Sequence, residues 1–268
     1  MKKYFSRFSA CLLLFLSSTS LIQSQEQKSL FEELLGMSRK QSIRAELLEK
    51  VLGMDGPISD MQLQHEQYFR QSIMRTSDDY TLVVIRMECG AGGVCESETL
   101  YSFDKSGKKI SRIPYEASHG DCSFDHNRRV RYFERGVIQI IESRVEFDCD
   151  KDSVIQAQHE SYEYNVFDDG RIEETNQLKI DSRRKFHEAS IKKLEEVYLA
   201  ERSKEELATM RNELFASYGY RFKSAKWQQY FGSKDWYKAT RDVVTKTDLT
   251  PIEYYNLQLI QRLEQQKN

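Results

Sequence analysis

Proline is scarce in this sequence, and long apolar runs and a large excess of one charge are missing from it. Its 268 residues include 12 glycine and 3 proline residues, which excludes collagen-like and low-complexity chains. No apolar stretch reaches the roughly 18 residues of a membrane-spanning helix, so we expect no internal membrane helix. Lysine and arginine number 40 against 42 aspartate and glutamate residues. Nucleic-acid-binding chains normally have a basic excess, so no nucleic-acid partner is expected.

The apolar and aromatic content indicates a folded chain. Hydrophobic residues make up 39% of the sequence and aromatic residues 12%. This is too apolar and too aromatic for a disordered chain. The length is typical of one or two domains.

The first 24 residues have the three parts of a bacterial-type signal peptide. Met1-Lys2-Lys3 gives a basic start, residues 11–16 form a short apolar centre, and residues 17–24 form a small polar end. The apolar centre is too short to span a membrane. The pattern therefore predicts export.

The point of cleavage has two candidates. We expect cleavage after Ser24, with Ser20 as the other option, and an uncleaved membrane anchor as a third outcome. Cys11 lies at the head of the apolar centre, whereas a lipid-modified cysteine would directly follow it. The mature protein is therefore expected to be periplasmic or secreted, without a transmembrane segment.

Hydrophobic spacing divides the rest of the chain into three segments. Residues 25–78 favour helix, because apolar residues from Leu30 onward recur at helical spacing. Residues 79–180 repeat strand, turn and strand without an intervening helix, which predicts an antiparallel meander of six or seven strands. Residues 186–268 favour helix again. The expected fold class is α+β, with a small all-α domain at the C-terminus.

The middle of the predicted sheet contains a hairpin around Arg135-Gly136. A two-residue turn there fixes which residues face each other along both strands. The apolar pairs that it predicts are Val130 with Ile141 and Phe124 with Phe147. In the same register Cys122 faces Cys149, at a distance that permits a disulfide. A bulge along the hairpin would shift this register.

Four cysteines remain after cleavage of the leader, which suggests two disulfides in an exported chain. If Cys122 pairs with Cys149, then Cys89 pairs with Cys95 across the glycine-rich residues 90–94. A glycine-rich loop can also cradle phosphate, but that use needs a helix N-terminus after the loop. A strand follows here, so a loop closed by a disulfide is favoured over a phosphate-binding loop.

The last segment carries clear helix signals. Ser203 with Glu206 and Thr250 with Glu253 form two capping boxes, and Gly219 can end the first of these helices. The aromatic residues between the two helices are expected to form a compact core: Trp227, Tyr230, Phe231, Trp236 and Tyr237.

Residues 195–265 resemble the YARHG domain, a small domain found in bacterial proteins and thought to be extracellular. The residues that carry the resemblance are Arg211-Asn212-Glu213-Leu214-Phe215-Ala216, Tyr218-Gly219-Tyr220, Phe222, Tyr230-Phe231, Trp236-Tyr237, Leu249-Thr250-Pro251-Ile252-Glu253 and Asn256. Where the family motif is Tyr-Ala-Arg-His-Gly, this chain has Phe215-Ala216-Ser217-Tyr218-Gly219, so the arginine and histidine are absent. The resemblance covers about a quarter of the chain and implies no catalytic residue.

Five residues of this segment are candidate ligand contacts: Arg211, Asn212, Tyr218, Trp236 and Tyr237. Arg211 and Asn212 interrupt an apolar helix face, where they could meet an acidic or glycan ligand. The favoured interpretation is that they bond to loop carbonyls and fix the fold. The pair Trp236-Tyr237 could stack on a sugar ring or belong to the aromatic core.

Two histidines and two carboxylates lie close together in the predicted sheet: His119, Asp121, Asp125 and His126. These residue types can bind a metal, although their spacing matches no familiar site and a solvated polar loop is the favoured interpretation. A serine-nucleophile motif of the Gly-x-Ser-x-Gly type is absent from the sequence. We therefore assign no catalytic residue and no cofactor.

The favoured function is a non-enzymatic, exported cell-envelope protein that binds a cell-wall glycan or another envelope protein. One alternative is an envelope hydrolase with a site near His119–His126, and another is a structural partner subunit. A deep cleft at those histidines would favour the hydrolase. A shallow exposed aromatic patch would favour binding.

Overall fold

The computed structural model describes residues 22–55, 57–89, 95–151 and 153–267. The predicted signal peptide lies outside the described residues except for its last three residues. Those three residues belong to a helix that runs over residues 22–36. None of the helices in the described part is long and apolar enough to cross a membrane.

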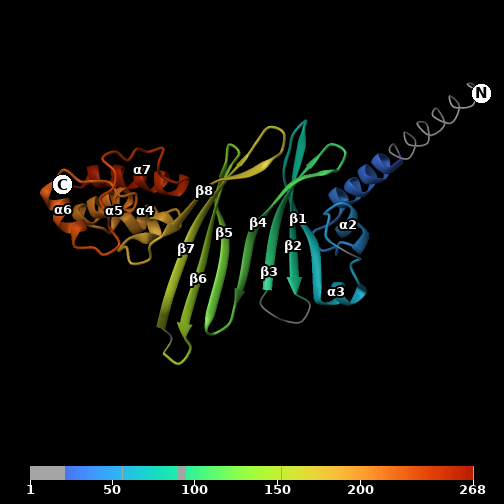
Figure 1. The fold of residues 1–268 in the computed structure, drawn as a ribbon, viewed down its shortest axis with the longest axis horizontal. Coiled ribbons are helices and arrows are strands. Elements are labelled where there is room, and N and C mark those ends of the chain that lie inside the picture. Colours follow the sequence, from blue (N-terminus) through green and yellow to red (C-terminus); the bar gives the residue numbers. More distant parts are fainter. Residues whose placement is uncertain (1–21, 56, 90–94, 152, 268) are drawn as a thin grey trace, which may run out of the picture. The chain divides into compact units, whose positions relative to one another are not determined.

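The fold class is α+β: along the sequence, helices precede and follow a run of eight strands in the described part of the chain (Figure 1). The strands are β1 (Glu66–Thr76), β2 (Tyr80–Cys89), β3 (Cys95–Asp104), β4 (Lys109–Gly120), β5 (Phe124–Glu134), β6 (Val137–Asp148), β7 (Ser153–Val166) and β8 (Ile172–Ile180). The helices are α2 (Ala45–Lys50), α3 (Asp60–His65), η1 (His187–Ser190), α4 (Glu196–Ala200), α5 (Lys204–Ser217), α6 (Ala225–Gly232) and α7 (Pro251–Gln266).

The strands form an antiparallel meander in which neighbours in the sheet follow the order of the chain. The meander was expected, but it has eight strands rather than six or seven. The additional strand is β1, which falls in the segment that the apolar spacing assigned to helix. The N-terminal helical segment is therefore shorter than 25–78.

Two irregularities in β1 explain why its spacing resembles that of a helix. The pairing of β1 with β2 shifts between Arg70 and Ser72, and again between Ile73 and Arg75. Each shift interrupts the period of two that marks a regular strand. Pairing with the buried strand β2 nevertheless fixes the segment as extended, so tertiary context overrides the local pattern.

Contacts divide the chain into two compact units. One contains the chain up to Tyr115 together with Phe167–Ile172, and the other contains Glu116–Val166 and Glu173–Asn268. This division differs from the predicted segments, because β5, β6 and β7 share a unit with the C-terminal helices. Inside the second unit, Ile141 of β6 packs with Ile180 and Ile252.

The first unit has an apolar core between its helices and strands β2 and β3. Residues of this core include Leu34, Leu47 and Leu48 on the helical side and Val83, Ile85, Tyr101 and Phe103 on the strands. Phe31 packs on Phe103 with ring centroids 4.9 Å apart. Gly107 has a φ of +81°, and a Cβ there would lie 2.3 Å from Cβ of Phe31, so only glycine fits this turn.

The predicted turn at Arg135-Gly136 is present, with φ values of +52° and +78°. Positive φ at both central residues is typical of the tight turn that joins two antiparallel strands. Near the turn the pairing follows the predicted register, as in Glu134 with Val137. The register shifts by one residue between Val130 and Tyr132, so Val130 faces Ile140. The predicted pairs Val130 with Ile141 and Phe124 with Phe147 are therefore wrong.

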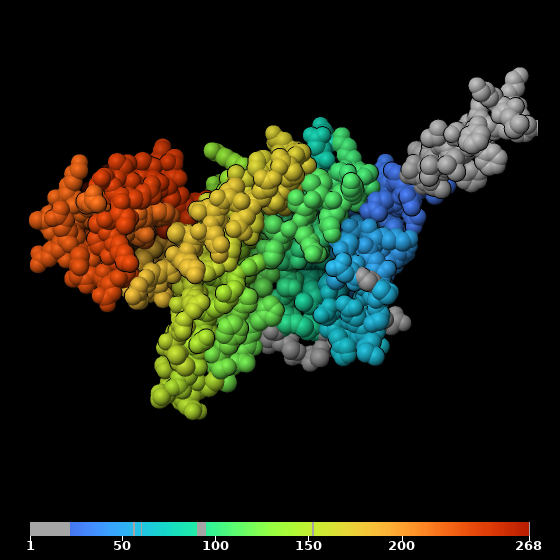
Figure 2. All heavy atoms as spheres, in the orientation of Figure 1, coloured from blue at the N-terminus to red at the C-terminus, as the bar shows by residue number. Residues whose placement is uncertain are grey.

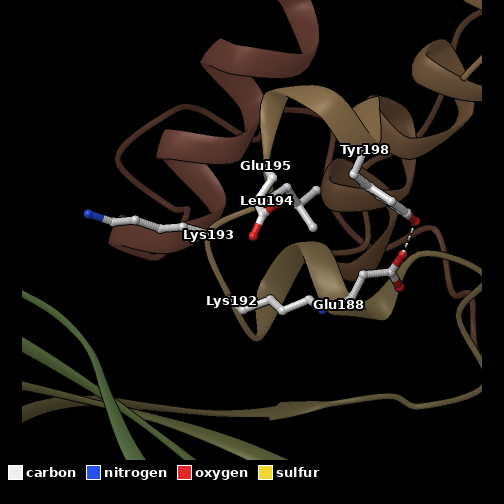
Figure 3. A pocket seen from close by; sticks show the side chains of 6 residues that line it. All are labelled: Glu188, Lys192, Lys193, Leu194, Glu195 and Tyr198. Atoms are coloured by element: carbon white, nitrogen blue, oxygen red, sulfur yellow. Dashed lines mark hydrogen bonds between the residues drawn. The ribbon is translucent and has the colours of Figure 1, made fainter. Parts of the chain in front are cut away.

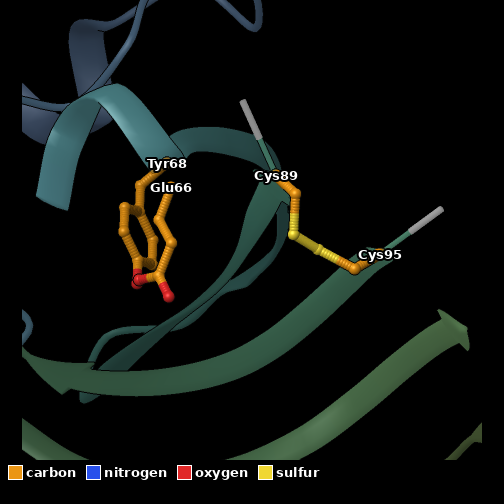
Figure 4. The surroundings of a disulfide bond; sticks show 4 residues. All are labelled: Glu66, Tyr68, Cys89 and Cys95. Atoms are coloured by element: carbon orange, nitrogen blue, oxygen red, sulfur yellow. A yellow bond between two sulfur atoms is a disulfide. The ribbon is translucent and has the colours of Figure 1, made fainter. Parts of the chain in front are cut away.

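One of the two predicted disulfides is formed. Cys89 and Cys95 are bonded, with their Cα atoms 5.7 Å apart (Figure 4). The loop between them, residues 90–94, lies outside the described residues. Cys122 and Cys149 are free thiols in the structure, contrary to the predicted pairing. The bulge near Val130 moves them out of directly opposed positions.

A groove beside helix α5 and the sequence-predicted site residues

Helix α5 positions the two polar residues on which the ligand-binding prediction depends. The capping box of Ser203 and Glu206 starts the helix as expected. Gly219 ends it with a φ of +76°, and a Cβ there would lie 2.2 Å from Oγ1 of Thr240. These two signals fix the length of the helix, and thereby the face that Arg211 and Asn212 occupy.

Arg211 and Asn212 line a groove of about 590 Å³. We call it the α5 groove and define it by Arg211, Asn212, Phe215, Tyr220, Phe222, Lys223, Ser224, Asp242, Val243 and Val244. Three aromatic side chains give it an apolar wall. Val243 is 66% exposed, so its apolar side chain faces solvent. A shallow, partly aromatic surface of this kind is typical of a binding site for another molecule.

Arg211 is held at the edge of the groove by an ion pair. Its Nε atom lies 2.8 Å from Oε2 of Glu264, and its Nη2 atom lies 3.2 Å from Oε1 of the same carboxylate. The Arg211 side chain remains 28% exposed. Asn212 is buried and donates from Nδ2 to the carbonyl of Ala208 at 2.8 Å. Asn212 therefore supports the helix, whereas Arg211 still presents part of its guanidinium to solvent.

Two extended backbone segments meet at one end of the groove. Tyr220 and Arg241 form a single parallel bridge, and the Arg221 N–H donates to the Arg241 carbonyl at 2.7 Å. Beyond this bridge, the backbone of Val243 and Val244 makes no backbone hydrogen bond within the described part of the chain. The groove therefore has an open backbone edge next to its aromatic wall.

Tyr218 is half-buried and does not line the groove. Its hydroxyl donates to Oε2 of Glu253, a carboxylate that is completely buried. Burial, together with the nearby charge of Glu253, raises the pKa of Tyr218 far above its usual range. The hydroxyl therefore stays protonated and serves as an internal hydrogen-bond donor. Tyr218 occupies the histidine position of the family motif.

Trp236 and Tyr237 belong to an aromatic cluster rather than to a separate surface. Phe231 is fully buried, and its ring centroid lies 6.0 Å from that of Trp236 and 5.7 Å from that of Tyr237. The Tyr237 hydroxyl donates to the Tyr220 carbonyl at 2.7 Å. These contacts favour the core interpretation of the pair. Through Tyr220, the cluster supports the aromatic wall of the α5 groove.

The two histidines near the start of β5 do come together. His119 of β4 is paired with His126 of β5, and their rings stack with centroids 5.7 Å apart. His126 Nε2 lies 2.9 Å from Oε1 of Glu142, which is 3% exposed and also contacts Arg128 and Arg144. Burial acts to raise the pKa of Glu142, but the hydrogen bond and charge of Arg128, with His126 and Arg144, hold it below its usual value.

The two aspartates of the predicted cluster do not join the histidines. Asp121 closes a turn, because its Oδ1 accepts from the Ser123 and Phe124 N–H groups at 2.7 and 3.1 Å. Asp125 accepts from the Asn127 side chain. Within the described residues, no group of three or more histidine, cysteine, aspartate or glutamate side chains could hold a metal ion. The candidate metal set is therefore dispersed over separate local hydrogen bonds.

A second cavity of about 450 Å³ lies beside η1 and α4 (Figure 3). The residues around it are Glu188, Lys192, Lys193, Leu194, Glu195 and Tyr198. The Tyr198 hydroxyl donates to Oε1 of Glu188 at 2.8 Å. The Lys193 ammonium lies 5.3 Å from the ring of Tyr132 and 5.1 Å from that of Tyr255. Tyr198, Glu188 and Lys193 therefore already have partners inside the protein.

Several important residues have no clear signal in the sequence. Lys223 and Val243 lie at the groove although neither belongs to a recognisable motif. Glu264 is the partner of Arg211 across α5 and α7, which the helical spacing alone does not reveal. Glu142 looks like any other strand carboxylate until the fold surrounds it with cations. The only available hint is that Glu142 directly follows the buried apolar residues Ile140 and Ile141.

The comparison with known families identifies one part of the chain. No curated protein sequence and no solved structure matches the chain. The family match ends shortly before the end of α7 and begins just before η1, so it contains the whole α5 groove. Residues 185–265 form a YARHG domain.

Proposed function

We propose that this protein is an exported, non-enzymatic interaction protein that binds a cell-envelope partner in the α5 groove of its YARHG domain. The observation that carries the proposal is the groove itself, which combines an aromatic wall, an exposed valine and an open backbone edge. Recognition surfaces commonly combine apolar contact with a few polar groups that set orientation. The YARHG domain, which is typical of exported proteins, supports the location.

An extended polypeptide is the partner that fits the groove best. A peptide can add its backbone to an open edge, while its apolar side chains fill adjacent pockets. The Val243 and Val244 backbone offers such an edge, and Phe215 and Phe222 offer apolar contact. The exposed ammonium of Lys223 would attract a carboxylate of the peptide. A cell-wall glycan would use the aromatic rings but not the backbone edge.

The hydrolase alternative is supported by one observation, the hydrogen bond of His126 to the buried Glu142. A carboxylate beside an imidazole can orient it as a general base. Here, however, Glu142 is shared with Arg128 and Arg144, and the cavities described above have other linings. Loss of a measured cell-wall hydrolysis in His126→Ala would support this alternative.

Capture from fractionated cells tests the binding proposal. The mature chain is immobilised and offered envelope extract and, separately, purified cell wall. The test variant carries Lys223→Glu and Val243→Asp, two exposed positions of the groove. The control is Val197→Asp in α4, because Val197 is 71% exposed and lies outside the groove. Substitutions at such exposed sites typically change stability by less than about 0.5 kcal/mol.

We expect the wild type and the control to retain the same envelope protein, and the double variant to lose it. Retention by all three chains would contradict the groove as the binding site. If binding to purified cell wall survives protease treatment of the wall, the ligand is a glycan and not a peptide. Export is tested separately by N-terminal sequencing of the mature protein, which is expected to begin at Gln25.

A further inference from the structure

Two exposed cysteines lie near each other at one end of strands β4, β5 and β6. Cys122 belongs to the turn between β4 and β5, and Cys149 follows the last residue of β6. The turn and the strand end are held together by a backbone bond, in which the Phe147 N–H donates to the Ser123 carbonyl at 2.8 Å. A hydrogen bond between the two thiols, together with partial desolvation, raises the pKa of Cys149.

The backbone on both sides of this pair is fixed independently of the sulfur atoms. The Asp121 carboxylate accepts from the Ser123 N–H and hydroxyl, both at 2.7 Å. The Asp148 carboxylate accepts from the Asp150 N–H at 3.1 Å. Because both turns have their own hydrogen bonds, the cysteine side chains can change rotamer without breaking the strand pairing. Figure 2 shows the yellow-green end of the β6–β7 hairpin on the face that is drawn.

We propose that Cys122 and Cys149 form a reversible redox site, which is oxidised to an intramolecular disulfide by exchange with an external disulfide. The site differs from Cys89–Cys95, which is already bonded and less exposed. It is independent of the α5 groove and does not rest on the proposed binding function. Both sulfur atoms face solvent, so that oxidant and reductant can reach either one.

The exchange proceeds through two substitutions at sulfur. The Cys122 thiolate attacks one sulfur of the external disulfide, which forms a mixed disulfide and releases one thiolate. The Cys149 thiolate then attacks the Cys122 sulfur, which forms the internal disulfide and releases the second thiolate. Two protons from the cysteines end on the two released thiols. The same exchange can start at Cys149, because both cysteines are exposed.

The cross-link would join the β4–β5 turn to the end of β6. It closes a loop that contains the whole β5–β6 hairpin, whereas Cys89–Cys95 closes only a short loop. A disulfide that closes a longer loop restricts the unfolded chain more strongly. Oxidation is therefore expected to raise the melting temperature of the unit that contains β5, β6 and β7.

Equilibration of the full chain in glutathione buffers of increasing oxidised fraction tests the proposal. Free thiols are alkylated at each step, and the linked peptides are identified by mass spectrometry. We expect a Cys122–Cys149 peptide that forms and is reversed by reduced glutathione, while the Cys89–Cys95 peptide persists as an internal control. The melting temperature should rise with oxidation in the wild type but not in a Cys122→Ser, Cys149→Ser double variant.

Single variants test the mixed-disulfide step. Cys149→Ser should accumulate a mixed disulfide of glutathione on Cys122, and Cys122→Ser should accumulate one on Cys149, because neither variant has the second thiol that would release glutathione. Complete alkylation of both cysteines at every ratio would overturn the proposal. A Cys122–Cys149 bond that reduced glutathione cannot reverse would show a permanent structural disulfide and would also overturn it.

Discussion

The two compact units of this protein are stabilised in chemically different ways. The core of the first unit is apolar, with Leu34, Leu47 and Leu52 completely buried among other hydrophobic residues. The second unit also buries charged and amide side chains: Glu213 is 1% exposed, and Glu253 and Asn256 are 0% exposed. The core of the first unit is therefore stabilised by the packing of apolar side chains, and the core of the second unit is stabilised by specific hydrogen bonds as well.

The polar groups of the second unit connect separate elements. Glu253 accepts from Ser190 and Tyr218 as well as from its own cap at Thr250. Asn256 of α7 accepts from the Leu194 N–H and donates to the carbonyls of Ala189 and Lys192. The side chains of Glu253 and Asn256 therefore have hydrogen-bond partners on several other elements, which offsets the cost of burying them.

The buried residues Glu213, Glu253 and Asn256 of the second unit lie within the part of the sequence that matches the YARHG domain. Many combinations of apolar residues can fill a core of given volume. A buried carboxylate that serves three donors, in contrast, can hardly be replaced by another residue. Glu253 and Asn256 both belong to the pattern that carries the YARHG resemblance, and both are buried in this network. Part of the pattern therefore specifies the fold rather than a ligand.

Removal of the Glu253 carboxylate should have the largest effect on stability. Glu253→Ala leaves the Ser190 and Tyr218 hydroxyls and the Thr250 N–H without their acceptor. Each buried group left unpaired costs about 1–3 kcal/mol, so we expect a loss of about 3 kcal/mol or more. Urea denaturation of the full chain measures it. Glu196→Ala, at an exposed ion pair of α4, is the control and should change stability by less than about 1 kcal/mol. An equal effect of both variants would contradict the network.

Substitutions that conserve side-chain volume should reduce stability by different amounts in the two cores. Asn256→Leu retains the size of the side chain but leaves the Leu194 N–H and two carbonyls unpaired, so we expect a loss of about 2–4 kcal/mol. Leu34→Met in the first unit should cost less than about 1.5 kcal/mol, because apolar residues of similar volume replace each other well. Thermal melting followed by circular dichroism compares them. Similar losses would mean that the two cores depend on packing to the same degree.

A single glutamine tests whether the C-terminal helices are independent of the strands in their unit. Gln139 of β6 is fully buried; its Oε1 accepts from the Ile252 N–H at 3.0 Å, and its Nε2 donates to Ser161 at 2.9 Å. Gln139→Ala should therefore cost about 1–3 kcal/mol. The segment prediction, which treats residues 186–268 as a separate domain, instead implies that the helical transition stays unchanged. Melting monitored at tryptophan fluorescence decides between the two, because both tryptophans, Trp227 and Trp236, lie in that segment.

Helix caps and tight turns could be predicted from the sequence, whereas the pairing and register of distant strands could not. The capping boxes at Ser203 and Thr250 and the turn at Arg135 depend on neighbouring residues, and the structure confirms them. The strand β1 and the bulge near Val130 depend on how a strand fits its neighbour, which spacing along one strand does not report.

The candidate site shows the same limit. Arg211 and Asn212 were identified because two polar residues interrupt an apolar helix face, and the structure places both at the α5 groove. The opposite edge, formed by Val243 and Val244, comes from an extended segment without a motif. The stacking of His119 on His126 follows from β4–β5 pairing, whereas the partner Glu142 required the register of a third strand.

The smallest expected effect is a contrast in pH dependence between two buried carboxylates of the second unit. Burial raises the pKa of Glu213 from its ordinary value of 4.5, although Arg184 and two backbone N–H groups oppose the shift. Its contribution to stability is therefore full below about pH 4.5 and is lost as the pH rises through its folded pKa. Glu142 has the opposite sign. Its cations lower its pKa, so its contribution is full above pH 4.5 and is lost as the pH falls through the lowered value.

Glutamine variants should reveal these opposite signs in melting temperatures measured between pH 3 and pH 7. Glu142→Gln should flatten the loss of stability on the acid side, because the group that is protonated there is gone. Glu213→Gln should flatten the loss above pH 4.5, while the glutamine oxygen can still accept from the Phe186 N–H that Glu213 Oε1 meets at 2.8 Å. Parallel curves for the wild type and Glu213→Gln would show that Glu213 titrates alike in the folded and unfolded chain. In that case its hydrogen bonds to the 185–186 backbone, and not its charge state, would be its whole contribution to the fold.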